Sequence, residues 1–132
     1  MEKIEHLGIA VRDLEKAKTL YSSLLNTSCY KEEEVKSQGV TTAFFKSGPN
    51  KIELLAATND SSPIAKFIEK KGEGIHHVAF AVDDIRSEMK RLAQDGFVLL
   101  NEEPQIGADN KLICFLHPKS THGVLIELCQ DI

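Results

Sequence analysis

The sequence predicts an α+β fold made of two β-α-β-β-β modules, and two internal repeats carry that prediction. Residues 6–14 match residues 77–85 at an offset of 71, and each copy begins with a histidine. The tripeptide Ile-Glu-Leu at 52–54 recurs at 126–128, an offset of 74. Because the two offsets are nearly equal, two similar modules fill the chain, and we expect them to form one domain over residues 1–132.

The first module is expected over about residues 1–60. Large and small apolar residues alternate over 7–11, which is typical of a strand with two different faces. A helix follows, with Asp13 as its N-cap and Asn26 just beyond its last turn, because apolar residues recur at helical spacing between them. Three more strands are expected near residues 28–36, 40–46 and 51–56.

The second module, about residues 73–132, repeats this order. Asp84 is expected to cap its helix and Gly96 to end it. Its remaining strands are expected near residues 97–100, 111–116 and 123–129.

A short helix over about 62–71 is predicted to link the modules. Ser62 is in the N-cap position, Pro63 in the first helical position, and Gly72 follows the last turn. The longest irregular segment is expected over residues 103–110.

Composition excludes several functional classes. The 132 residues are 42% hydrophobic and 27% charged, with a net charge of −4. An acidic chain does not provide the basic surface that nucleic-acid binding needs, and no apolar run approaches the roughly 20 residues of a membrane span. We expect a cytoplasmic protein whose three cysteines are reduced, with Cys114 and Cys129 packing as small apolar residues.

Four polar residues stand on strands that are otherwise apolar. His6 and His77 lie on the faces opposite the large residues of their strands, and Glu53 and Glu127 lie opposite their isoleucine and leucine neighbours. A carboxylate in an apolar strand is costly unless it is paired or binds a metal. Two histidines and two glutamates at repeated positions therefore indicate a divalent metal site. The alternative is that the histidines are ordinary core residues and the glutamates face solvent.

Three other histidines are weaker candidates as ligands. His76 is adjacent to His77, but His77 is the residue that aligns with His6, and a shift of one residue reverses the faces of a strand. His117 and His122 precede the last strand, where we expect them on the substrate side or in solvent.

Several longer segments resemble a known family. They are residues 4–11, 62–67, 74–80, 82–85, 117–120 and 123–128. Together with the four polar residues, they resemble the vicinal-oxygen-chelate superfamily and, within it, the methylmalonyl-CoA epimerase family. The resemblance covers nearly the whole chain. It implies a cupped, partly open mixed sheet formed by the two modules, an acyl-CoA substrate and a homodimer.

The resemblance also implies a ligand set. Carried over position by position, the metal ligands of the family fall on His6, Glu53, His77 and Glu127. Some epimerases have glutamine at the position of Glu53, so this set equals that of bacterial glyoxalases I. An octahedral ion with four protein ligands keeps two positions for substrate. The family resemblance implies Co²⁺ first, with Ni²⁺, Mn²⁺ or Zn²⁺ as alternatives.

Epimerisation at C2 of a malonyl thioester passes through an enolate and requires proton transfer on both faces. Some epimerases carry a glutamate, proposed as one of the two bases, where this chain has Thr42. The remaining candidates for the two bases are Glu53 and Glu127. Water is the alternative source of one proton.

The CoA-binding residues are less well defined by the sequence. Lysines that could meet the phosphates are Lys66, Lys70, Lys71, Lys111 and Lys119. The loop over residues 104–110 is expected to close over the acyl group.

Other members of the superfamily provide rival hypotheses. A glyoxalase I of the bacterial type carries an arginine four residues after its first histidine, where this chain has Ala10. An extradiol dioxygenase uses two histidines and one carboxylate, so a fourth ligand at Glu53 argues against it. A metal-free binding protein of the same fold is the alternative that lacks catalysis.

Overall fold

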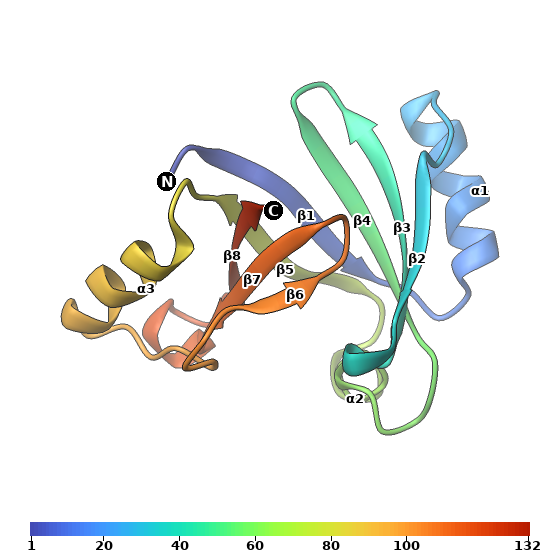
Figure 1. Ribbon diagram of the computed structural model, residues 1–132. Helices are drawn as coiled ribbons and strands as arrows, with labels where there is room; N and C mark the ends of the chain where they lie inside the picture. The colour runs from blue at the N-terminus through green and yellow to red at the C-terminus, as the bar shows by residue number, and fades with distance from the viewer. The chain divides into compact units, whose positions relative to one another are not determined.

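The computed structural model describes residues 1–132 and divides them into two compact units. One unit is His6–His76, and the other combines Met1–Glu5 with His77–Ile132. The chain order strand, helix, three strands occurs twice (Figure 1). The two predicted β-α-β-β-β modules and the α+β class are therefore confirmed.

The unit His6–His76 contains one four-stranded arrangement and two α-helices. Its strands are hydrogen-bonded in the order β2-β3-β4-β1, in which β1 is parallel to β4 and the other neighbours are antiparallel. The elements are β1 (Lys3–Ala10, beginning in the other unit), α1 (Leu14–Leu25), β2 (Lys31–Val35), the 3-10 helix η1 (Lys36–Gln38), β3 (Val40–Ser47), β4 (Asn50–Ala57) and α2 (Pro63–Lys71).

The ends of α1 and α2 follow the capping signals in the sequence. Asp13 accepts a hydrogen bond from the backbone N–H of Lys16 at 3.1 Å, and Asn26 ends α1 in the left-handed region at φ 52°. Ser62 accepts one from the N–H of Ala65 at 3.1 Å, and Gly72 follows α2. The predicted bounds of both helices are confirmed.

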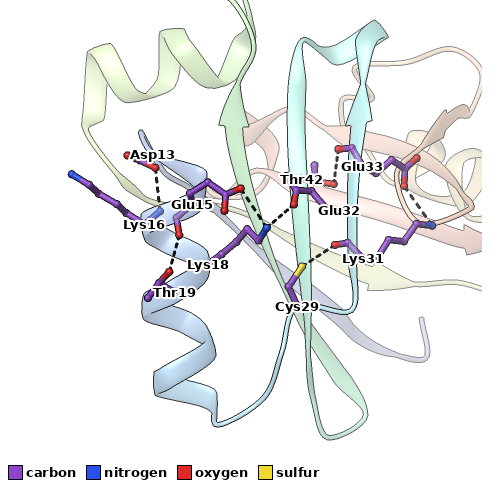
Figure 2. A network of polar contacts seen from close by, with 10 residues as sticks. All are labelled: Asp13, Glu15, Lys16, Lys18, Thr19, Cys29, Lys31, Glu32, Glu33 and Thr42. Atoms are coloured by element: carbon purple, nitrogen blue, oxygen red, sulfur yellow. Dashed lines mark hydrogen bonds and ion pairs between the residues drawn. The ribbon is translucent and has the colours of Figure 1, made fainter.

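Helix α1 covers one face of β3 and β4 (Figure 1). Ala43, Phe45 and Leu54 are fully buried beneath it. An ion pair also joins α1 to β2, since Lys18 Nζ lies 2.6 Å from Glu32 Oε2 (Figure 2). This hydrogen bond raises the pKa of the Lys18 ammonium. The opposite face of this sheet carries His6 and Glu53.

The other unit repeats the arrangement with strand order β5-β8-β7-β6. Ile85, Met89 and Leu92 of its long helix are buried against Val82 and Leu128. The elements are β5 (Gly74–Ala81, beginning in the first unit), α3 (Ile85–Gln94), β6 (Gln105–Gly107), β7 (Lys111–Leu116), the 3-10 helix η2 (Pro118–Ser120) and β8 (Ile126–Asp131).

The edge next to β7 differs from the prediction. The strand expected near 97–100 is reduced to one bridge, Leu99 to Leu116, and β6 lies within the segment expected to be irregular. Between these two pairings the Asn101 side chain accepts a hydrogen bond from the Phe115 N–H at 3.1 Å. A side chain thus replaces a backbone partner, and the edge strand is interrupted.

Two of the three cysteines pack as small apolar residues, as the sequence predicts. All three cysteines are free, and Cys114 and Cys129 are almost fully buried among apolar residues. Burial raises the pKa of the Cys114 thiol. None of the helices has the length and apolar character that crossing a membrane requires.

Candidate active site

The first histidine–glutamate pair is built by two neighbouring parallel strands. His6 lies on β1 and Glu53 on β4, and Gly8 is the residue paired with Glu53 in the ladder. Gly8 therefore lies beside Glu53 on the face of the sheet that also carries His6. His6 Nε2 lies 3.3 Å from Glu53 Oε1, and both residues are 5% exposed.

The second pair has the same construction in the other unit. His77 lies on β5 and Glu127 on β8, and the small residue Ala79 is paired with Glu127. His77 Nε2 lies 3.2 Å from Glu127 Oε1, and these residues are 3% and 5% exposed. The sequence repeat is therefore also a repeat of side-chain geometry.

A phenylalanine borders each pair. The Phe44 ring meets the His6 ring edge-on with centroids 6.3 Å apart, and Phe44 is paired with Glu53 in the β3–β4 ladder. Phe115 stands in the same relation to His77, at 5.8 Å, and to Glu127. These apolar rings limit the access of water, so each carboxylate is held in a setting where its charge acts strongly.

The donor set fits a divalent metal ion. Each pair offers one imidazole nitrogen and one carboxylate oxygen, and all four side chains are buried. Buried carboxylates that are paired or bind a metal avoid the cost of an isolated charge. Groups of buried histidine and acidic side chains of this kind occur in the structure. Their nitrogen and oxygen atoms suit cobalt, nickel, manganese or zinc.

His76 has a different environment from His77. Its ring meets that of Phe67 on α2 edge-on, with centroids 4.9 Å apart. Since successive residues of a strand point to opposite faces, His76 is directed away from the face that carries His77. This placement supports His77 as the ligand and leaves His76 a packing role.

The two later histidines lie outside the histidine–glutamate pairs. His117 Nδ1 accepts a hydrogen bond from the Lys119 backbone N–H at 3.0 Å, which makes His117 the cap of η2. His122 is exposed and has the left-handed backbone conformation, φ 55°. His117 therefore organises the turn before β8.

Thr42 is 1% exposed on β3, on the same face as Glu53. Its hydroxyl lies 3.5 Å from the backbone oxygen of Glu33, its partner on β2, and the Glu33 carboxylate lies 3.5 Å from Lys31 Nζ (Figure 2). Glu33 thus adds a carboxylate to the Glu53 face. The sequence analysis did not single it out, although the period-two alternation of Lys31, Glu33 and Val35 is the signal that identifies their common face.

Two of the lysines expected to meet phosphates have other contacts. Lys111 is nearly buried and pairs with Asp131. Lys71 Nζ lies 5.8 Å from the centre of the Phe67 ring. Lys66 and Lys70 also lie on α2, and Lys119 lies in η2. Thus Lys111 already has a partner within the protein.

Comparison with known proteins places the chain in a family. The model of the Glyoxalase/Bleomycin resistance protein/Dioxygenase superfamily matches residues 5–115, and the chain belongs to this superfamily. The chain is 42% identical to the ethylmalonyl-CoA/methylmalonyl-CoA epimerase of Cereibacter sphaeroides over 97% of both chains. Within the superfamily it belongs to the methylmalonyl-CoA epimerase family, and it is an enzyme of this type.

Solved structures agree with this assignment. A variant of the Streptomyces coelicolor methylmalonyl-CoA epimerase in complex with 2-nitronate-propionyl-CoA is 34% identical and has a TM-score of 0.96, covering 99% of this chain and 95% of that one. A methylmalonyl-CoA epimerase in complex with methylmalonyl-CoA and NH4+ has the same identity, TM-score and coverage. The predicted fold class is thereby confirmed.

Proposed function

We propose that this enzyme interconverts the (R) and (S) forms of methylmalonyl-CoA with the help of a bound divalent metal ion. The observation that carries the proposal is the repetition of one buried histidine–glutamate pair in a chain 42% identical to an epimerase. Metal binding would explain why all four polar side chains are buried and why they occur as two equivalent pairs. Four unrelated core residues would not be expected to repeat in this way.

The residues that would hold the ion are His6, Glu53, His77 and Glu127, and cobalt is the proposed metal. When bound, a divalent cation would supply positive charge that stabilises the negative charge developing on the substrate during the reaction. The histidines contribute neutral nitrogen ligands, and Phe44 and Phe115 limit water around them.

The two glutamates are the proposed proton-transfer groups. Inversion at C2 needs one group to remove a proton from one face of the carbon and another to deliver a proton to the opposite face. Glu53 and Glu127 have equivalent positions in the two repeats and are both nearly buried. Thr42 lacks a group that can accept a proton at neutral pH, so it serves neither role.

The remaining parts of the proposal concern the setting of the enzyme. We propose one functional domain over residues 1–132, a homodimer, and a cytoplasmic location. The three free cysteines support a reducing compartment. Sedimentation equilibrium of the metal-loaded protein tests the dimer directly.

The experiment that tests the function is exchange of the C2 proton of methylmalonyl-CoA in deuterium oxide, with and without added cobalt. We expect deuterium to enter C2 and a single epimer to be converted to a mixture of both epimers, and we expect both processes to depend on the metal. Efficient turnover of the hemithioacetal of methylglyoxal and glutathione, without any C2 exchange, would instead identify a glyoxalase. Protein purified without chelator that neither retains nor takes up a divalent ion would identify a binding protein.

A further inference from the structure

The turn over residues 117–125 connects β7 to β8, and side chains of the turn itself make several of its hydrogen bonds. His117 Nδ1 accepts a hydrogen bond from the Lys119 backbone N–H at 3.0 Å. The Ser120 hydroxyl donates to the His117 backbone oxygen at 3.0 Å and accepts from the Val98 N–H at 3.2 Å. The His117 N–H also donates to the Val98 oxygen, at 2.7 Å. His117 and Ser120 therefore tie the turn to the segment beside β7.

The far end of this turn leads directly into the strand that carries Glu127. The Thr121 hydroxyl donates a hydrogen bond to the Val124 backbone oxygen, just before β8 begins. Within β8, Glu127 is paired with Phe115 of β7, and its carboxylate lies 3.2 Å from His77 Nε2. The hydrogen-bonded turn thus stands immediately before one of the four candidate metal ligands.

The register of β8 decides which of its side chains faces His77. Because successive strand residues point to opposite faces, a shift of one residue would turn Glu127 away and present an apolar neighbour, Ile126 or Leu128. In an antiparallel hairpin, the geometry of the connection fixes this register. Loss of hydrogen bonds in the turn should therefore loosen the position of Glu127 before it affects distant parts of the protein.

The His117 ring has two nitrogen atoms with different tasks. A nitrogen that accepts a hydrogen bond carries no proton, so the proton of the neutral ring lies on Nε2. An asparagine has its Oδ1 atom as many bonds from Cβ as Nδ1, and asparagine is a preferred residue at N-cap positions. A glutamine instead places its amide near the position of Nε2. The cap and the outer nitrogen can therefore be tested separately.

We infer that His117 is a positioning residue for Glu127: its ring fixes the turn over residues 117–125, and the turn fixes the register of β8. This role of His117 rests on the proposed function, because Glu127 is a proposed metal ligand and proton-transfer group. His122 is exposed on the same turn and makes no cap, so it is the matched control.

The first test needs neither metal nor substrate. Amide hydrogen exchange of the metal-free protein should be about fivefold faster over residues 124–128 in His117→Gln, because losing a cap typically shifts a local opening equilibrium by about that factor. His117→Asn and His122→Asn should exchange like the wild type. Exchange over α1 serves as the internal reference for an intact fold. Wild-type protection of residues 124–128 in His117→Gln would overturn the inference.

The second test separates positioning from substrate contact. At saturating cobalt, His117→Gln should lower kcat for methylmalonyl-CoA at least about tenfold with little change in KM, because a displaced base transfers a proton poorly. His117→Asn should retain kcat. Loss of activity in His117→Asn, with normal activity in His117→Gln, would identify a substrate contact through Nε2 and would overturn the positioning role.

The two tests also distinguish this role of His117 from the proposed reaction. If the wild-type enzyme does not epimerise methylmalonyl-CoA, the proposed function fails, whereas faster exchange in His117→Gln alone still supports the fixed register of β8. If the wild type epimerises and His117→Gln keeps wild-type exchange and kcat, the reaction stands and the positioning role fails.

Discussion

Gly8 lies directly opposite Glu53 in the ladder between β1 and β4, two residues from His6, whose Nε2 lies 3.3 Å from Glu53 Oε1. In the other unit the equivalent place is occupied by Ala79. A methyl group is therefore compatible with the histidine–glutamate geometry at this position. Substitutions of different size at Gly8 can show how much space the pair needs.

We predict that Gly8→Val lowers metal affinity roughly 10- to 100-fold, because a branched side chain would crowd the space beside the His6–Glu53 pair. Gly8→Ala should bind metal normally, as its counterpart is already alanine. Calorimetric titration with cobalt measures both affinities, and far-UV circular dichroism checks that both variants are folded. Equal affinities in the two variants would show that the space at Gly8 is unimportant.

The two adjacent histidines should behave differently. His77→Ala removes an imidazole that lies 3.2 Å from Glu127, and it should lower metal occupancy severely. His76→Ala removes only the contact with Phe67 and should keep the metal. Elemental analysis after purification without chelator measures occupancy. A comparable loss in both variants would refute the register on which the choice of His77 rests.

Substitution of the two glutamates should distinguish their role in metal binding from their role in proton transfer. Glu127→Gln keeps an oxygen that can ligate but removes a base, so we expect appreciable metal and at least about a hundredfold loss of turnover. Glu53→Gln should be similarly impaired, because Thr42 offers no substitute base.

These rates must be compared at matched metal occupancy, together with deuterium uptake at C2. Near-normal epimerisation by Glu53→Gln would remove Glu53 from the mechanism. In that case Glu33, which lies on the same face, becomes the next carboxylate to substitute.

The cysteines should react at very different rates. Cys29 is only half-buried, whereas Cys114 and Cys129 are enclosed, and burial raises the pKa of Cys114. Cys29 should react first, because its thiol is the most accessible of the three to a reagent in solution. Titration with a disulfide reagent should detect one thiol in the native protein and three in denaturant. Cys29→Ser should abolish the native reaction, and a rapid native reaction of two or three thiols would contradict the packing of the core.

Features with a local cause were predictable from the sequence. Asp13, Ser62 and Asp84 each cap a helix as expected, since capping depends on a few neighbouring residues. The two histidines and two glutamates could be identified because they occupy equivalent positions in the two copies of the internal repeat. The structure pairs His6 with Glu53 and His77 with Glu127 within their own units.

Features that depend on distant residues were not predictable. The edge strand after α3 is broken because the side chain of Asn101 bonds to Phe115, and strand patterns contain no signal for that substitution. Lys111 was a candidate contact for the CoA phosphates, but its strand position buries it beside Asp131. The contact between the Tyr30 and Phe44 rings joins the residue before β2 to β3, so only the folded chain reveals it.

The charged residues of β2 oppose self-association of the protein through this strand. This strand is the outermost of its sheet, and its residues 31–34 are Lys-Glu-Glu-Glu. An outer strand is a template on which another chain can add a strand, and the self-assembly of amyloid begins in this way. Here a second copy of β2 would bring like charges together, and Lys18 already engages Glu32. The charged outer strand β2 thus protects the protein from aggregation through this edge.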